Sequence, residues 1–131
     1  MALAAALVLA CSCAAAAPDA AAAHFAREIQ PIFDAHCVVC HQAGVEQAGL
    51  NLEEGEAYAN LVGVQSTQSR LVRVAPGSPA QSYLLHKLRG TQAAVGGSGA
   101  RMPLAEGGSS TLPDAQQTLL ENWIARGAPN D

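Results

Sequence analysis

The first helical pattern lies in residues 28–37, where apolar side chains recur three or four positions apart. The apolar residues are Ile29, Ile32, Phe33 and Cys37. This spacing is typical of one face of a helix. Because proline is tolerated best in a first turn, Pro31 places the start of the regular helix near Ile29 or Gln30. The apolar positions in residues 54–62 predict a second, shorter helix.

Two more helices are expected in the second half of the chain. Ser78 suits an N-cap, Pro79 the first helical position and Gln81 the partner position of a capping box, so a helix is predicted over residues 78–89. A last helix is predicted over residues 113–126. Its apolar stripe consists of Leu119, Leu120, Trp123 and Ile124, and Gly127 follows as the C-terminal cap.

The region between these two helices is rich in glycine. Residues 90–108 hold 6 of the 12 glycines, which predicts a mobile loop without regular structure. No strand pattern of useful length and no internal repeat is evident elsewhere. The fold class expected is therefore all-α, with three to five short helices joined by long connections.

The N-terminal segment differs in composition from the rest. Residues 1–23 are dominated by alanine and carry an apolar stretch of signal-peptide length, although no lysine or arginine precedes it. The residues around Cys11 also resemble a bacterial lipoprotein box, in which Cys11 would carry the lipid. We expect residues 1–23 to be an export signal with an N-terminal tail, and residues 24–131 to form one extracytoplasmic domain. A buried alanine helix is the alternative.

Composition narrows the function further. The 131 residues suit one domain, and 50% of them are hydrophobic, but only 4% are aromatic, so the core has few large side chains. The net charge of −4 argues against a nucleic-acid-binding protein, which needs a basic patch. No apolar run reaches the roughly 18 residues of a membrane span. These features exclude a DNA-binding protein, a channel and a multi-domain enzyme.

The most specific motif is Cys37-Val38-Val39-Cys40-His41. The C-x-x-C-H spacing is that of covalent haem attachment, in which two cysteines form thioethers and the adjacent histidine binds the iron. A single haem c would also supply the large apolar group that the aromatic-poor core lacks. Two alternatives stay open: a disulfide or dithiol pair, and a zinc site, for which the chain shows no second pair of ligands.

The second axial ligand must come from a distant part of the chain. Met102 is the single methionine outside the N-terminal signal, and it lies in the glycine-rich segment beside Pro103. A core methionine that fills a gap is the ordinary alternative. Among the histidines, His86 is the competing ligand, whereas His24 is expected in a solvated tail and His36 is poorly placed to reach the opposite face.

Several segments together resemble a monohaem cytochrome c domain, and more narrowly the planctomycete-type c domains of bacterial surface and periplasmic proteins. The segments are EIQPIFDAHCVVCH, AGLNLEE, VAPGSPAQSYLLHKLRG, RMPL and LPDAQQTLLENWIARGAPND, and the match covers roughly residues 25–131. The resemblance implies a small cytochrome c-like fold around one haem. It also implies covalent attachment at Cys37 and Cys40, with His41 as the proximal and Met102 as the distal iron ligand.

A site with both axial positions filled favours a non-enzymatic electron carrier in the periplasm or elsewhere outside the cytoplasm. Its acidic surface favours redox partner proteins with basic patches. We expect no nucleic-acid partner, and no membrane contact other than through a lipid on Cys11. Two alternatives stay open: a small haem enzyme or gas sensor with a displaceable distal ligand, and a haem module of a larger redox assembly or filament. A scattered polar surface is expected for four basic residues, with pairing to the haem propionates or a docking face as the alternatives: Arg70, Arg73, Lys87 and Arg89.

Overall fold

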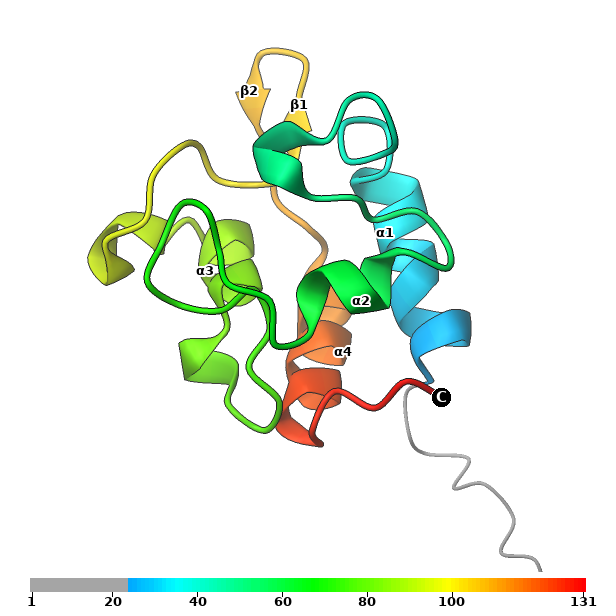
Figure 1. Cartoon of the computed structure of the whole chain (residues 1–131). Coiled ribbons are helices and arrows are strands. Elements are labelled where there is room, and N and C mark those ends of the chain that lie inside the picture. The colour runs from blue at the N-terminus through cyan, green and yellow to red at the C-terminus, as the bar shows by residue number, and fades with distance from the viewer. Residues whose placement is uncertain (1–23) are drawn as a thin grey trace, which may run out of the picture.

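The computed structural model describes residues 24–131 and is mostly helical (Figure 1). A π-helical turn, Phe25–Ile29, leads into α1 (Gln30–His36), and the later helices are α2 (Ala57–Leu61), α3 (Tyr83–Arg89) and α4 (Asp114–Ala125). Short 3-10 turns occupy Gln47–Gly49, Pro79–Gln81 and Gln92–Val95. The predicted predominance of short helices is confirmed. Helix α1 begins at Gln30, as Pro31 in its first turn predicts.

A cluster of aromatic rings holds the two ends of the described chain together. The Phe25 ring centroid lies 5.3 Å from that of Tyr58 and 5.3 Å from that of Trp123 in α4. The backbone N–H of Phe25 donates to the carboxylate of Asp131 at 3.0 Å. Trp123 is fully buried, and its indole N–H donates to the carbonyl of Pro129 at 2.9 Å. These contacts place the first turn, α4 and the C-terminal tail in one packed layer.

The predicted start of the third helix is wrong. Pro79–Gln81 is a separate 3-10 turn, Ser78 makes no capping hydrogen bond with its side chain, and α3 begins only at Tyr83. The residue between them, Ser82, has an extended backbone, and its hydroxyl accepts from the N–H of Ala75 at 2.9 Å. This contact, made seven residues back along the chain, competes with the local capping box. The helix ends as expected, at Gly90 with φ of 73°.

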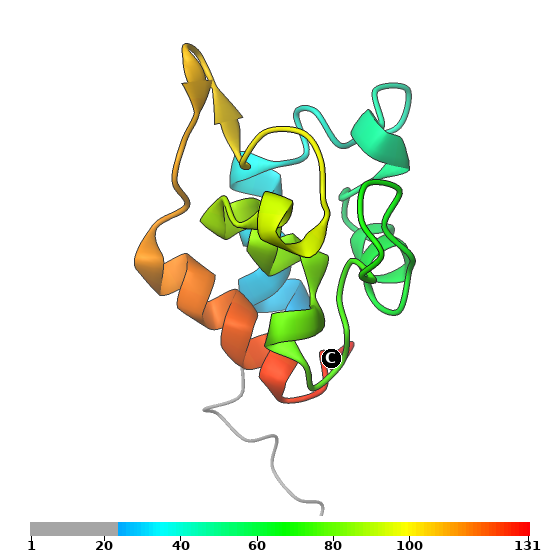
Figure 2. The ribbon, with the colours of Figure 1, turned by 90° about the vertical axis from the view of Figure 1, so that its left-hand side faces the viewer.

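The glycine-rich segment is also more ordered than predicted. It contains the 3-10 turn Gln92–Val95 and an antiparallel hairpin of β1 (Leu104–Ala105) and β2 (Gly108–Ser109). Figure 2 shows the hairpin projecting from the end of the molecule that lies opposite the C-terminus. Strands of two residues are too short to produce a period-2 pattern, which explains why the sequence did not predict them.

The predicted export signal and the cysteines Cys11 and Cys13 lie outside the described residues. Within residues 24–131, no helix has the length and apolar character needed to cross a membrane.

Candidate functional site

A cavity of about 450 Å³ lies between α3, the turn after α1 and the segment that carries Met102. Volumes of about 300–1,000 Å³ with mostly apolar walls are typical of sites for small molecules and cofactors. The aliphatic part of this wall consists of Leu50, Leu52, Leu61, Leu84 and Leu88. Three further lining residues, Val39, Val45 and Leu104, are exposed to solvent. The cavity therefore reaches the surface through an apolar rim.

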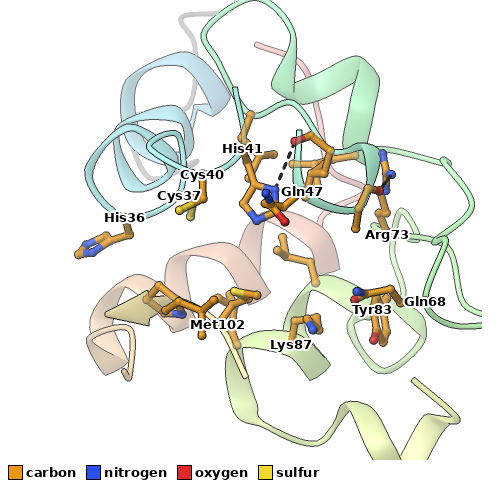
Figure 3. Close-up of a pocket in the computed structure, with 18 of the residues that line it drawn as sticks. His36, Cys37, Cys40, His41, Gln47, Gln68, Arg73, Tyr83, Lys87 and Met102 are labelled. Atoms are coloured by element: carbon orange, nitrogen blue, oxygen red, sulfur yellow. Dashed lines mark hydrogen bonds between the residues drawn. The ribbon is translucent and has the colours of Figure 1, made fainter. Parts of the chain in front are cut away.

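The four predicted haem-binding residues line this one cavity. Cys37, Cys40 and His41 come from the turn after α1, and Met102 comes from a segment about half the chain away. Figure 3 shows His41 on one side of the cavity and Met102 on the opposite side. The structure thus brings the four residues together. Their roles as attachment points and iron ligands stay predictions.

The end of α1 places the C-x-x-C-H motif. The N–H groups of Cys37 and Val38 both donate to the carbonyl of Phe33, at 2.8 and 3.0 Å, which closes the helix. The N–H of His41 then donates to the carbonyl of Cys37 at 3.0 Å, so the motif forms a tight turn. This turn is anchored by Phe33, which is buried in the hydrophobic core. A rigid helix end therefore presents three potential haem-binding groups to one cavity wall.

Backbone hydrogen bonds to Leu50 and Gln47 orient the imidazole of His41. Its Nδ1 lies 3.3 Å from the carbonyl oxygen of Leu50. A carbonyl only accepts, so Nδ1 carries the proton and Nε2 keeps its lone pair. Burial lowers the pKa of His41 and favours the neutral ring. A neutral imidazole with one nitrogen bound to a carbonyl is the usual arrangement of a histidine metal ligand.

The two cysteines are free thiols, Cys37 half-buried and Cys40 exposed. Burial, followed by the nearby charge of Asp34, raises the pKa of Cys37 to about 12. Redox-active C-x-x-C pairs instead have a lowered thiol pKa, because the thiolate is the reactive form. The environment of Cys37 therefore does not favour the dithiol alternative. For zinc, no group of three or more His, Cys, Asp or Glu side chains suited to a metal occurs within residues 24–131.

The segment carrying Met102 is tethered, contrary to the expectation of a mobile loop. The N–H of Met102 donates to the carbonyl of Lys87 at 2.9 Å, and Nε of Arg101 donates to the carbonyl of Leu88 at 2.9 Å. The side chain of Gln92 donates to the carbonyl of Gly99 at 3.0 Å. Met102 itself is half-buried and packs against the hydrophobic core. Hydrogen bonds from several directions thus compensate for the many glycines.

The other histidines are engaged elsewhere. His86 is not among the residues that line the cavity, and its ring bonds Thr91 Oγ1 at 2.8 Å and the carbonyl of Ala80 at 3.0 Å. His24 pairs with Asp131 at 3.3 Å, so it is not in a freely solvated tail. His36 is at the cavity edge, and Figure 3 shows its ring directed away from His41 and Met102. The geometry therefore favours Met102 over the histidines.

Sequence reasoning missed the burial of two cations in the cavity wall. Arg73 is 9% exposed and Lys87 is 8% exposed, whereas a scattered polar surface was the expectation and pairing with haem propionates the alternative. Arg73 donates to three backbone carbonyls, and Nζ of Lys87 donates to the carbonyl of Ser98 at 3.2 Å. Within residues 24–131, neither has a carboxylate at ion-pair distance. Buried charges are normally paired, so this wall favours an anionic group in the cavity.

Local signals for this burial do exist in the sequence. Arg73 lies between Val72 and Val74, and Lys87 follows Tyr83 by one helical turn, so both are placed among apolar or partly apolar residues. Tyr83 is buried as well and lines the same wall. Figure 3 shows Arg73, Gln68, Tyr83 and Lys87 at the side of the cavity away from the two cysteines. The cavity therefore has a sulfur-bearing side and a polar, cationic side.

Comparisons with known proteins give one structural similarity. No protein-family model matches the chain, and no curated protein matches it. A solved structure of Kuenenia stuttgartiensis hydrazine synthase is similar with a TM-score of 0.54 and 23% sequence identity. The match covers 80% of this chain and 16% of the hydrazine synthase chain. It shows that a similar fold is present within that longer chain.

Proposed function

We propose that this protein is a c-type cytochrome with one covalently bound haem, and that it carries electrons outside the cytoplasm. The observation that carries the proposal is the meeting of Cys37, Cys40, His41 and Met102 in one apolar cavity, with His41 and Met102 on opposite sides. In this proposal the two cysteines bind the haem edge covalently. His41 and Met102 are the iron ligands, in a small cytochrome c-like fold.

The residues present fit a haem in four respects. The aliphatic wall suits the porphyrin, the free thiols suit thioether attachment, and the bond between His41 and Leu50 leaves Nε2 available for iron. Arg73 and Lys87 supply positive charge for the two carboxylates that a haem carries. A bound haem with histidine and methionine ligands supplies a one-electron couple at a raised potential.

The arrangement favours electron transfer over catalysis. Both axial positions would be filled by side chains of this chain, so a substrate would first have to displace Met102. The segment around Met102 is held by hydrogen bonds to α3, which opposes such displacement. The net charge of −4 favours partners with basic patches, and we expect their association to weaken as salt rises. The predicted export signal supports a periplasmic or other extracytoplasmic location.

Attachment is tested with the full chain expressed in a bacterial periplasm with haem-attachment machinery. The wild type should retain haem through denaturing electrophoresis, because thioethers survive unfolding. Cys37→Ala with Cys40→Ala should lose all covalent haem while Val39→Ala, which changes an exposed residue between them, should keep it. Haem that persists on the double variant would contradict the assignment of the cysteines.

Ligation is tested by Met102→Ala, read by visible spectra, potentiometry and carbon monoxide binding. The variant should keep its haem, lose the weak red-end absorption band of a methionine–ferric iron bond, bind carbon monoxide readily and have a lower potential. His86→Ala is the matched control and should behave as the wild type, because His86 does not line the cavity. If His86→Ala alone changes these properties, the second ligand is histidine.

A second candidate is a haem module of a larger redox assembly. The observation that favours it is the similarity to 16% of the hydrazine synthase chain, since a similar fold there forms part of a longer polypeptide. The purified chain should then associate with itself or with other redox subunits. Light scattering across a concentration series measures the mass directly. A constant monomeric mass at all concentrations favours the independent carrier.

A further inference from the structure

One backbone carbonyl in the glycine-rich segment receives two side-chain donors from α3. The hydroxyl of Tyr83 and Nζ of Lys87 both donate to the carbonyl oxygen of Ser98, each at 3.2 Å. Residues four apart lie on the same face of a helix, so α3 directs both donors to one point. Tyr83 and Lys87 are buried, 4% and 8% exposed. We call this arrangement the Ser98 clamp.

The same helix holds the other end of this short segment. The carbonyl of Lys87 accepts from the N–H of Met102 at 2.9 Å, and the carbonyl of Leu88 accepts from Nε of Arg101 at 2.9 Å. Lys87 therefore contacts the segment twice, with its side chain at Ser98 and with its backbone at Met102. The three residues between these contacts cannot move away from α3 without breaking one of them.

The glycines beside Ser98 are required by this close approach. A Cβ atom at Gly97 would overlap the side chain of Tyr83 and lie 2.8 Å from the carbonyl oxygen of Gln92. A Cβ atom at Gly99 would lie 3.2 Å from Nζ of Lys87, and this glycine also has a φ of +76°. Only glycine lets the backbone come so near the two donors. The glycines on both sides of Ser98 therefore allow the clamp to form, and they also make the segment flexible.

Burial of Lys87 has an energetic cost that surface placement would avoid. Removing an ammonium group from water is unfavourable unless hydrogen bonds or opposite charge compensate. The carbonyl of Ser98 supplies one such bond. Two of the three ammonium hydrogens stay available for an anionic group in the cavity. The clamp and an interaction with a ligand carboxylate are therefore compatible.

From these contacts we propose that Tyr83 and Lys87 are positioning residues that hold Met102 in the cavity wall opposite His41. The inference rests on the proposed haem ligation by Met102. Without the clamp, the glycine-rich segment regains backbone freedom, and the thioether leaves the iron more often. By holding Met102 in place, the clamp keeps the iron site closed, as the proposed electron carrier requires. It thereby opposes the binding of exogenous ligands.

The test uses the full, haem-loaded protein and measures two properties of the iron site. The first is the red-end band of the methionine–ferric iron bond, and the second is the rate of carbon monoxide binding to the reduced protein. Tyr83→Phe should speed carbon monoxide binding about five-fold, because one neutral hydrogen bond contributes about that factor. Lys87→Met should speed carbon monoxide binding more than Tyr83→Phe does, and it should weaken the band. Lys87→Arg keeps a charged donor, so it should retain part of the band that Lys87→Met loses.

Matched controls separate positioning from a general loss of stability. Tyr58→Phe removes a hydroxyl that donates to the carbonyl of Ala128 at 2.8 Å, and Tyr58 does not line the cavity. Arg89→Met removes an exposed cation from α3, the helix that carries Tyr83 and Lys87. Both controls should leave the band and the carbon monoxide rate unchanged. Gly97→Ala is an independent variant that displaces Tyr83 without altering charge, and it should resemble Tyr83→Phe.

The outcomes are distinguishable. If the wild type shows the band and the Tyr83, Lys87 and Gly97 variants bind carbon monoxide at the wild-type rate, the clamp does not position Met102 and the inference is wrong. If Tyr58→Phe speeds binding as much as Tyr83→Phe, the effect is general destabilisation, which also overturns it. If the haem-loaded wild type lacks the band, Met102 ligation itself fails, and the proposed function must be revised along with the clamp.

Discussion

The two sides of this molecule are filled in different ways. The layer formed by the first turn, α4 and the C-terminal tail is packed with aromatic rings, whereas the side facing α3 contains a cavity lined mostly by aliphatic residues. Four of the five aromatic residues are in the first layer or its neighbour, and Tyr83 is the one that lines the cavity. A chain with few large side chains thus concentrates them on one side. The other side leaves a cavity of about 450 Å³ between its side chains.

The largest effect on stability is expected in the packed layer. Trp123→Ala removes a fully buried ring, its contacts with Phe25 and Tyr58, and the hydrogen bond to Pro129. We expect the free energy of unfolding to fall by about 3–5 kcal/mol. Denaturant titration of the purified protein measures this. Leu104→Ala, at the exposed rim of the cavity, is the control and should change it little. Equal losses in the two variants would contradict the comparison.

An intermediate effect is expected for Tyr58→Phe. The ring keeps its contacts with Phe25 and Trp123, and only the hydrogen bond to the carbonyl of Ala128 is lost. The free energy of unfolding should fall by about 1 kcal/mol, the usual contribution of one such bond. Thermal or denaturant unfolding measures the change. A loss close to that of Trp123→Ala would mean that the hydroxyl, and not the rings, holds the C-terminal tail.

The smallest effect on stability is expected from enlarging a side chain at the cavity. Leu84→Phe adds volume beside open space, so unfolding of the haem-free chain should change by no more than about 0.5 kcal/mol. The same change in the packed layer, Leu120→Phe, should cost about 1–3 kcal/mol, because no space is available there. Leu84→Phe should also reduce the fraction of protein that takes up haem. Normal haem uptake with a large loss of stability would contradict both expectations.

Elements with a local signal were predicted closely. Helix α4 starts and ends within one residue of its predicted bounds, because its apolar stripe and the glycine after it are both properties of neighbouring residues. The start of α3 was not predicted, because Ser82 bonds Ala75 across a turn. The burial of Arg73 and Lys87 was missed because burial depends on which other segments cover a residue. Their neighbours alone do not decide it.

The sequence by itself determined which reactive side chains lie together at the end of α1. Cys37, Cys40 and His41 lie within five consecutive residues at the end of a helix, so their proximity follows from local geometry. Only the tertiary structure decided that Met102 lies across the cavity from His41. That placement rests on contacts between residues far apart in the chain. Such contacts form only when the helices pack, which local patterns do not encode.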